Sequence, residues 1–121
     1  MSNVKDKLQV LKKWDKRING TSLSGYLVGT LDEVVAVFGP PLDGDNIDGY
    51  KTDAEWMILV DGNDPVTIYN YKNGKNYNKE DGLDISEMDE WHIGSKTVAA
   101  VWKLQRYLDE VGSPMGIRVS N

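Results

Sequence analysis

The sequence contains no cysteine and a single histidine among its 121 residues. The missing cysteines exclude disulfide scaffolds, thiolate zinc sites, iron–sulfur clusters and cysteine nucleophiles. Any imidazole relay or multi-histidine metal site would have to use His92 alone, and no Gly-x-Ser-x-Gly element accompanies it. Most histidine-dependent chemistry is therefore disfavoured.

Long hydrophobic runs are also missing, because no stretch approaches 18 consecutive apolar residues. The first residues, MSNVKDKLQVLKKW, have no apolar region behind their charges, so we expect neither a membrane span nor a secretory signal. Hydrophobic residues make up 40% of the chain and include four tryptophans and six tyrosines, which is enough for one core. We expect one domain over 1–121, located in the cytoplasm.

Charge is distributed unevenly along the chain. The first 18 residues contain six basic and two acidic side chains, whereas the whole chain has a formal net charge of −5. The body is therefore clearly acidic and offers no broad basic surface for duplex nucleic acid. The basic segment is either a solvated helix face or a docking arm, and both interpretations stay open.

Three helices are predicted from spacing and end signals. Apolar residues in 4–18 recur at steps of three and four, which predicts a basic amphipathic helix leading into a body over 22–119. A capping box from Thr30 to Glu33 opens a second helix, which Gly39 and the following prolines end. A third helix is expected over 96–111, with Val98, Val101, Trp102, Gln105 and Leu108 on or near one stripe.

The strands are predicted from β-rich runs and turn residues. Residues 54–60 and 66–72 flank Asp-Gly-Asn-Asp-Pro and form the strongest hairpin signal. In the second run, aliphatic positions alternate with Thr67, Tyr69 and Tyr71, so the two faces differ. Extended segments at 25–29 and 88–94 add strands, and 115–119 either forms an edge strand or frays. The expected class is α+β, a small antiparallel sheet packed against about three helices.

Two acidic groups invite a metal or acid–base interpretation. Asp43, Asp45 and Asp48 lie in DGDNIDG, and clustered oxygens on a turn suit calcium. Their spacing does not match an EF-hand, however, so a solvated turn is favoured and no metal is expected. A second set, Glu87, Asp89 and Glu90, is interpreted as a solvated acidic loop.

The run Gly-Ser-Lys-Thr at 94–97 resembles the end of a phosphate loop. Free N–H groups at a helix start beside a lysine suit an anion. The glycine five residues earlier is missing, which disfavours a nucleotide triphosphatase. Helix capping by Ser95 or Thr97 is favoured, and weak anion binding near Ser95 and Lys96 stays open.

An interleaved aromatic and basic set follows the hairpin in YNYKNGKNY. It consists of Tyr69, Tyr71, Lys72, Lys75 and Tyr77. Such a set could stack a base and pair a phosphate, or its tyrosines could simply cover the second face of the sheet. His92 is likewise either a packed structural residue or a pocket residue.

Five short motifs carry a family resemblance over about 25–102. They are FG-x-P at 38–41, KTDAEW at 51–56, IYNYK at 68–72, GKNY at 74–77 and WHIG at 91–94. The sequence resembles a family of small, mostly uncharacterised bacteriophage accessory proteins. Ser95 stands where that pattern usually has a glycine, and the basic segment lies outside the matching region. The resemblance implies a phage protein that acts inside the bacterial cell.

A non-enzymatic host-takeover or anti-defence protein is the function expected from these observations. The first hypothesis is a sponge that sequesters a nucleotide-type immune signal, without a cofactor and completed by oligomerisation. Its expected ligand-binding residues are Trp56, Tyr69, Tyr71, Lys72, Lys75, Tyr77, Trp91, His92, Ser95 and Lys96. The second is an inhibitor of a host CRISPR or restriction nuclease, presenting 43–55 or the basic segment. The third is a small hydrolase using His92.

Overall fold

A six-stranded antiparallel sheet and two α-helices make up the fold in a computed structural model, which describes residues 8–13, 15–42, 52–62, 64–71 and 87–119. The strands are β1 (Leu8–Leu11), β2 (Ser22–Val28), β3 (Thr52–Val60), β4 (Asp64–Tyr71), β5 (Glu90–Ser95) and β6 (Gly116–Val119). The helices are α1 (Leu31–Phe38), α3 (Val98–Glu110) and the short 3-10 turn η2 (Lys16–Ile18). The strand order is β1-β3-β4-β5-β2-β6.

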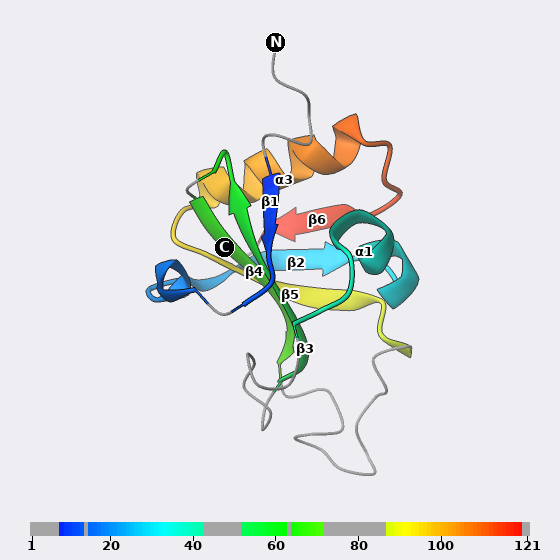
Figure 1. Cartoon of the computed structure of the whole chain (residues 1–121). Helices are drawn as coiled ribbons and strands as arrows, with labels where there is room; N and C mark the ends of the chain where they lie inside the picture. Colours follow the sequence, from blue (N-terminus) through cyan, green and yellow to red (C-terminus); the bar gives the residue numbers. More distant parts are fainter. Residues whose placement is uncertain (1–7, 14, 43–51, 63, 72–86, 120–121) are drawn as a thin grey trace.

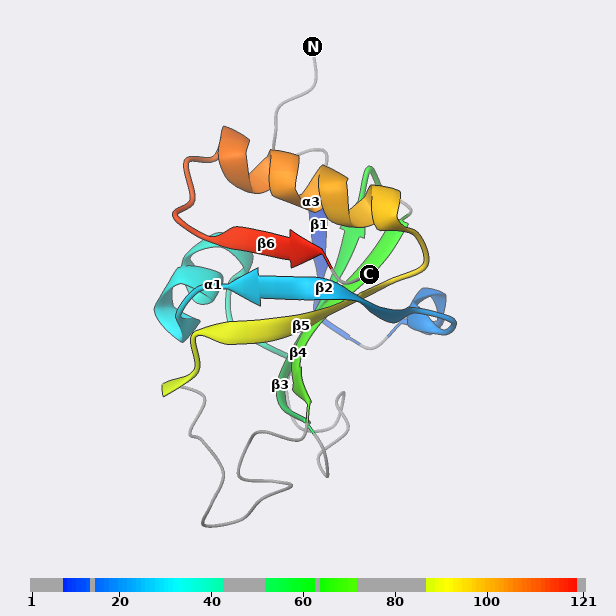
Figure 2. The same cartoon turned by 180° about the vertical axis from the view of Figure 1, so that it is seen from behind.

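The sheet is strongly twisted. In Figures 1 and 2, β1, β3 and β4 run across the direction of β2, β5 and β6, and α3 extends alongside β6. Right-handed strand twist accumulates from strand to strand, and two bulges, in β2 and β3, add to it. The two halves therefore wrap around a common core.

Both helices pack on one face of the sheet, which we call the inner face. The core there joins Val34 and Phe38 of α1 to Val101, Leu104 and Leu108 of α3. The strands contribute alternate residues, as a two-residue period requires. These inner strand residues are Leu27, Ala54, Trp56, Ile58, Val60, Val66, Ile68, Trp91 and Ile93.

Two tryptophans hold both ends of α1. The rings of Trp56 and Trp91 meet edge to face at 5.3 Å. The indole N–H of Trp91 donates to the carbonyl of Gly29 before the helix, and that of Trp56 donates to the carbonyl of Gly39 after it, each at 2.9 Å. Each buried ring thus satisfies its polar atom internally.

The predicted second helix and hairpin are confirmed. Thr30 and Glu33 form the reciprocal capping box, and Gly39 is the C-cap of α1. β3 and β4 pair across a turn at Asp61 and Gly62, both with positive φ. At the bulge of β3, the buried side-chain oxygen of Asn70 accepts from the backbone N–H of Ala54 at 2.9 Å.

The tail forms an edge strand, which resolves the alternatives left open for 115–119. β6 pairs with β2, and its outward N–H at Ile117 donates to the side chain of Gln105 on α3 at 2.9 Å. An uncovered edge strand invites unwanted pairing. Here α3 covers part of that edge.

The helix predicted over 4–18 is wrong for its described residues. Leu8–Leu11 is a strand paired with β3, and η2 follows after Asp15, whose carboxylate accepts from the backbone N–H of Arg17. Leu8 and Val10 pack on the main core while Leu11 packs with Met57, so the same residues satisfy a period of two. Pairing of this segment with the buried strand β3 therefore outweighs its helical spacing. As a result the described residues form two α-helices where about three were expected.

The buried stripe of α3 also differs from the prediction. Val101 and Leu108 are buried as expected, together with Ala100 and Leu104. Val98 and Trp102 are instead 47% and 56% exposed. The helical spacing placed Trp102 on or near the buried stripe, but Ala100 and Leu104 are the residues that join Val101 and Leu108 in the core.

Candidate functional site

A row of polar and aromatic side chains crosses the outer face of the sheet in register. Glu55 pairs with Tyr69, Tyr69 with His92, His92 with Tyr26, and Tyr26 with Arg118. These five residues, from β3, β4, β5, β2 and β6, are called the outer row. Each alternates with core residues on its own strand, so the pattern that builds the inner face also builds this row.

The rings of the outer row are in contact. Tyr69 and His92 stack nearly parallel, with centroids 5.5 Å apart and planes at 17°. Tyr26 lies 5.3 Å from His92 at 53°, and the guanidinium of Arg118 lies 4.7 Å above the Tyr26 ring. The three rings are half-buried. The row is thus a surface of contacting aromatic rings that ends in a cation.

Gly94 gives the outer row room. A Cβ at this position would meet the hydroxyl oxygen of Thr67 at 2.7 Å and the ring of Tyr69 at 3.5 Å. Only a glycine lets both side chains cross β5 there. The motif WHIG therefore has a structural explanation: Trp91 and Ile93 face the core, while His92 and Gly94 shape the outer face.

His92 presents a neutral ring near pH 7. Burial lowers the pKa of His92 from its ordinary value of 6.5, while the charge of Glu90 and a backbone hydrogen bond with Tyr69 act in the opposite direction. A neutral imidazole stacks on tyrosine without bringing a charge into the row.

Arg118 is positioned by a carboxylate. Its guanidinium donates to Glu90 at 2.8 Å, and the two side chains are 63% and 45% exposed. An exposed ion pair of this kind is weak. Arg118 can therefore exchange this carboxylate for another anion.

The structure separates the predicted site residues. Tyr69 and His92 come together in the outer row. Trp56 and Trp91 are 1% and 0% exposed in the core, so the expectation that their rings stack a ligand is corrected. Large aromatic side chains are more often buried in a core than exposed for ligand binding, and the two motifs do not show which face of the sheet each tryptophan occupies.

The other predicted ligand-binding groups of the aromatic and basic set lie outside the described residues. They are the side chain of Tyr71 and the whole of Lys72, Lys75 and Tyr77. The aspartates Asp43, Asp45 and Asp48 lie outside them as well. Within the described residues, no three His, Asp or Glu side chains are grouped to hold a metal ion.

Sequence reasoning missed Tyr26 and Arg118, and it considered Glu55 for a function only as the end of the acidic 43–55 surface of the inhibitor hypothesis. Tyr26 lies in the extended segment predicted at 25–29, and Arg118 in the predicted tail. Alternation marks them as facing opposite to Leu27 and Ile117. Only the strand order, which brings β2 between β5 and β6, shows that they join His92.

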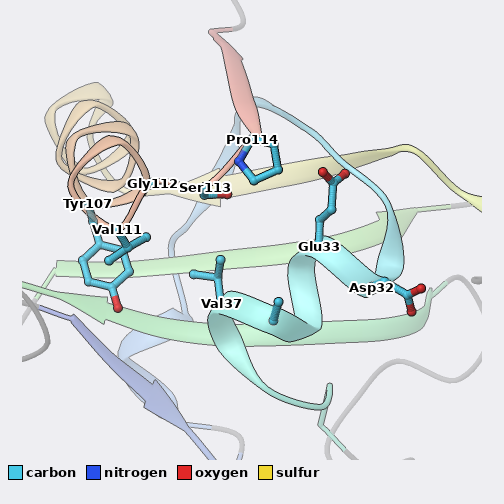
Figure 3. Close-up of a pocket in the computed structure, with 9 residues that line it drawn as sticks. Asp32, Glu33, Val37, Tyr107, Val111, Gly112, Ser113 and Pro114 are labelled. Atoms are coloured by element: carbon cyan, nitrogen blue, oxygen red, sulfur yellow. The ribbon is translucent and has the colours of Figure 1, made fainter.

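A second concave feature lies between α1 and α3. This groove has a volume of 520 Å³ and is lined by Asp32, Glu33, Ala36, Val37, Tyr107, Val111, Gly112, Ser113 and Pro114. Figure 3 shows the two acidic side chains at one end and Tyr107 with Val111 at the other. No part of the outer row lines it.

The run Gly-Ser-Lys-Thr begins α3 by ordinary capping. The hydroxyl of Thr97 accepts from the backbone N–H of Ala100, as favoured from sequence. Ser95 is buried, where it hydrogen-bonds Ser24 and the carbonyl of Thr97, so its expected ligand role is corrected. Lys96 is exposed.

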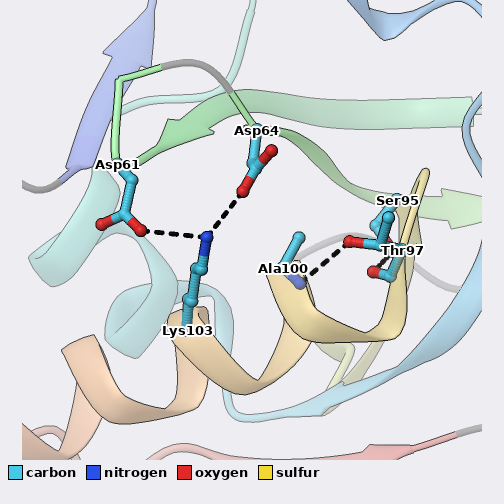
Figure 4. A network of polar contacts seen from close by, with 6 residues as sticks. All are labelled: Asp61, Asp64, Ser95, Thr97, Ala100 and Lys103. Atoms are coloured by element: carbon cyan, nitrogen blue, oxygen red, sulfur yellow. Dashed lines mark hydrogen bonds and ion pairs between the residues drawn. The ribbon is translucent and has the colours of Figure 1, made fainter.

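The turn between β3 and β4 is tied to the same helix by another lysine. Lys103 forms ion pairs with Asp61 and Asp64 at 3.0 and 2.8 Å (Figure 4). These carboxylates raise the pKa of Lys103 above its ordinary value. The contact fixes the hairpin against α3, far along β4 from the ring of Tyr69.

No family model, no curated protein and no solved structure matches the chain. None of the helices in the described part has both the length and the apolar character needed to cross a membrane. The candidate site therefore depends on its own geometry, and the outer row is its best-defined part.

Proposed function

We propose that this chain is a non-enzymatic binding protein that captures a nucleotide-type ligand on the outer row. The observation that carries the proposal is the continuous row of contacting rings, stacked at Tyr69 and His92 and tilted at Tyr26, that ends in the exposed guanidinium of Arg118. Aromatic faces bind bases with little sequence preference, and a guanidinium binds phosphate through paired donors.

The dimensions of the row favour a ligand larger than one nucleoside. Five neighbouring strands separated by about 4.8 Å place Glu55 about 19 Å from Arg118 along the row. The row has a carboxylate at one end, for an exocyclic amine, and a cation at the other, for phosphate. A linear or cyclic dinucleotide suits this length and polarity.

Glu90 sets the affinity of the proposed site. Its carboxylate occupies the donors of Arg118, so a ligand phosphate has to displace it. Because both side chains are exposed, this exchange costs little. Removal of the Glu90 charge should therefore tighten nucleotide binding.

The resemblance to phage accessory proteins supports a biological setting for this capture. A phage protein that sequesters a nucleotide-type signal would blunt a bacterial defence without catalysis. Assembly from several copies would complete the site, as expected from sequence. Phage origin, anti-defence action and oligomerisation are parts of this proposal.

The two alternatives receive less support. The inhibitor hypothesis names 43–55, most of which lies outside the described residues, and a basic helix that is a strand at Leu8–Leu11. The hydrolase hypothesis uses His92 and gives no role to its ring contacts with two tyrosines or to Arg118. Ligand capture makes fuller use of the observed contacts.

Native mass spectrometry with a panel of linear and cyclic adenine and guanine mono- and dinucleotides tests the proposal. We expect a bound mass with at least one dinucleotide, lost in Tyr69→Ala and Arg118→Gln. Glu90→Gln should bind about threefold more tightly, the size of one weak ion pair. Protein that binds no member of the panel would contradict the proposal.

Matched controls separate the outer row from the rest of the surface. Arg106 on α3 is exposed like Arg118, and Tyr107 is half-buried like Tyr69. Arg106→Gln and Tyr107→Ala should leave nucleotide binding unchanged. Equal losses of nucleotide binding in the control variants and the outer-row variants would show that the binding site is not on the outer face of the sheet.

A further inference from the structure

The groove between α1 and α3 has an apolar floor that the fold leaves open. Val37 is half-buried on α1, and Val111 at the end of α3 is 43% exposed. The ring of Tyr107 and the side chain of Pro114 extend the same apolar surface. The volume of 520 Å³ is within the range of ligand sites, and the groove is open to solvent.

Charge of one sign gathers around this floor. Asp32 and Glu33 lie in the first turn of α1, and Glu33 is held there by the backbone N–H of Thr30. Figure 3 places both carboxylates at the end of the groove opposite Val111.

The C-terminal end of α3, beside Val111 at the other end of the groove, is also acidic. Its last turn has no basic residue, although cations are favoured near the negative end of a helix. It ends instead with Asp109 and Glu110. Arg106, one turn earlier, lines a separate, smaller cavity beside the groove together with Glu110. Asp32 and Glu33 are therefore the carboxylates that a cation in the groove would reach, and among the described residues the groove lining contains no basic side chain that would compete with it.

We propose that the groove docks a short segment of a partner protein in which an apolar side chain lies next to a lysine or arginine. The apolar side chain would pack on Val37, Val111 and Tyr107, and the cation would reach Asp32 and Glu33. An open groove with separate apolar and acidic ends suits a chain that enters and leaves, and complementary charge gives it specificity. This site is independent of the outer row.

An NMR titration with two blocked peptides tests the docking proposal. Acetyl-Leu-Arg-Leu-amide should shift the backbone amides of Val37, Val111 and Gly112 in a saturable way, whereas acetyl-Leu-Glu-Leu-amide should not. Asp32→Asn should weaken the arginine peptide about threefold, as expected for one exposed charge. Equal shifts with both peptides, or none at millimolar concentration, would overturn the proposal.

A pair of exposed valines on the same helix provides the matched control. Val111→Lys puts a cation into the groove and should weaken binding of the arginine peptide at least about tenfold. The lysine removes part of the apolar floor and its positive charge repels the arginine. Val98, 47% exposed at the other end of α3, lies outside the groove, so Val98→Lys should bind normally. A concentration-dependent dimer that Val111→Lys abolishes would place a second copy there and contradict the peptide assignment.

Discussion

The two faces of β5 use the same short motif for opposite purposes. Trp91 and Ile93 are fully buried in the core, while the half-buried His92 belongs to the outer row and Gly94 leaves room for the side chains beside it. On the inner face, both indole N–H groups donate to backbone carbonyls beside α1. On the outer face, the aromatic row ends at an exposed guanidinium. The buried tryptophans thus stabilise the core around α1, while the outer ring contacts form the surface on which the proposed ligand binding depends.

Trp91→Ala should break the inner face and gives the largest expected effect. It removes the buried ring that meets Trp56 and the bond to Gly29, and should lower the free energy of unfolding by about 3–5 kcal/mol. Urea denaturation measures the change. Trp102→Ala, at an exposed position, should stay within about 0.5 kcal/mol of the parent. Similar losses of unfolding free energy in both variants would contradict the larger contribution of the buried Trp91 ring.

Gly94→Ala should disturb the outer face through overpacking. The added methyl meets the hydroxyl of Thr67 at 2.7 Å and should cost about 1–3 kcal/mol of unfolding free energy. Thr67→Ala in the same chain removes that oxygen and should recover part of the loss, which a double-mutant cycle detects. Additive effects of the two substitutions would contradict the proposed contact.

Tyr69→Ala should cost much less stability than Trp91→Ala, although both remove an aromatic ring. Cross-strand pairs each contribute up to about 1 kcal/mol, and the Tyr69 ring is half-buried. Thermal and urea unfolding should therefore show that the Tyr69→Ala variant is still folded, while native mass spectrometry should show that it no longer binds the nucleotide. A loss as large as that of Trp91→Ala would mean that the outer row is a second core.

The pH dependence from His92 is the smallest expected effect. Because the pKa of His92 is lowered in the fold, the unfolded chain binds a proton more readily in the window just below 6.5. Stability should be full above 6.5 and fall as the pH drops through the folded pKa. His92→Gln should flatten this part of the urea-midpoint profile, and an unchanged profile would contradict the burial of the ring.

Local signals in the sequence were enough to predict α1, the β3–β4 hairpin and the end of α3. The capping box at Thr30, the turn at Asp61 and Gly62, and the stop after Glu110 are decided by neighbouring residues. The helix predicted over 4–18 was wrong for its described residues, because the spacing of Leu8 and Leu11 fits a helix while that of Leu8 and Val10 fits a strand. Pairing with β3, which is remote in sequence, decided between them.

The candidate site was only partly predictable for the same reason. Tyr69 and His92 were found because their motifs combine aromatic and polar residues. Tyr26 and Arg118 join them only through the order β5-β2-β6, and this nonlocal arrangement leaves no signal in a single sequence. Trp56 and Trp91 were misassigned because composition does not show which face of a strand is covered.

The imidazole signals of His92 give the most direct test of ligand capture, since the chain has one histidine and its ring lies at the centre of the outer row. Titration with the linear and cyclic dinucleotides should move these NMR signals in a saturable way, and Arg118→Gln should abolish the movement. Dinucleotides that leave the His92 ring unchanged, or that bind while shifting only distant residues, would contradict the account.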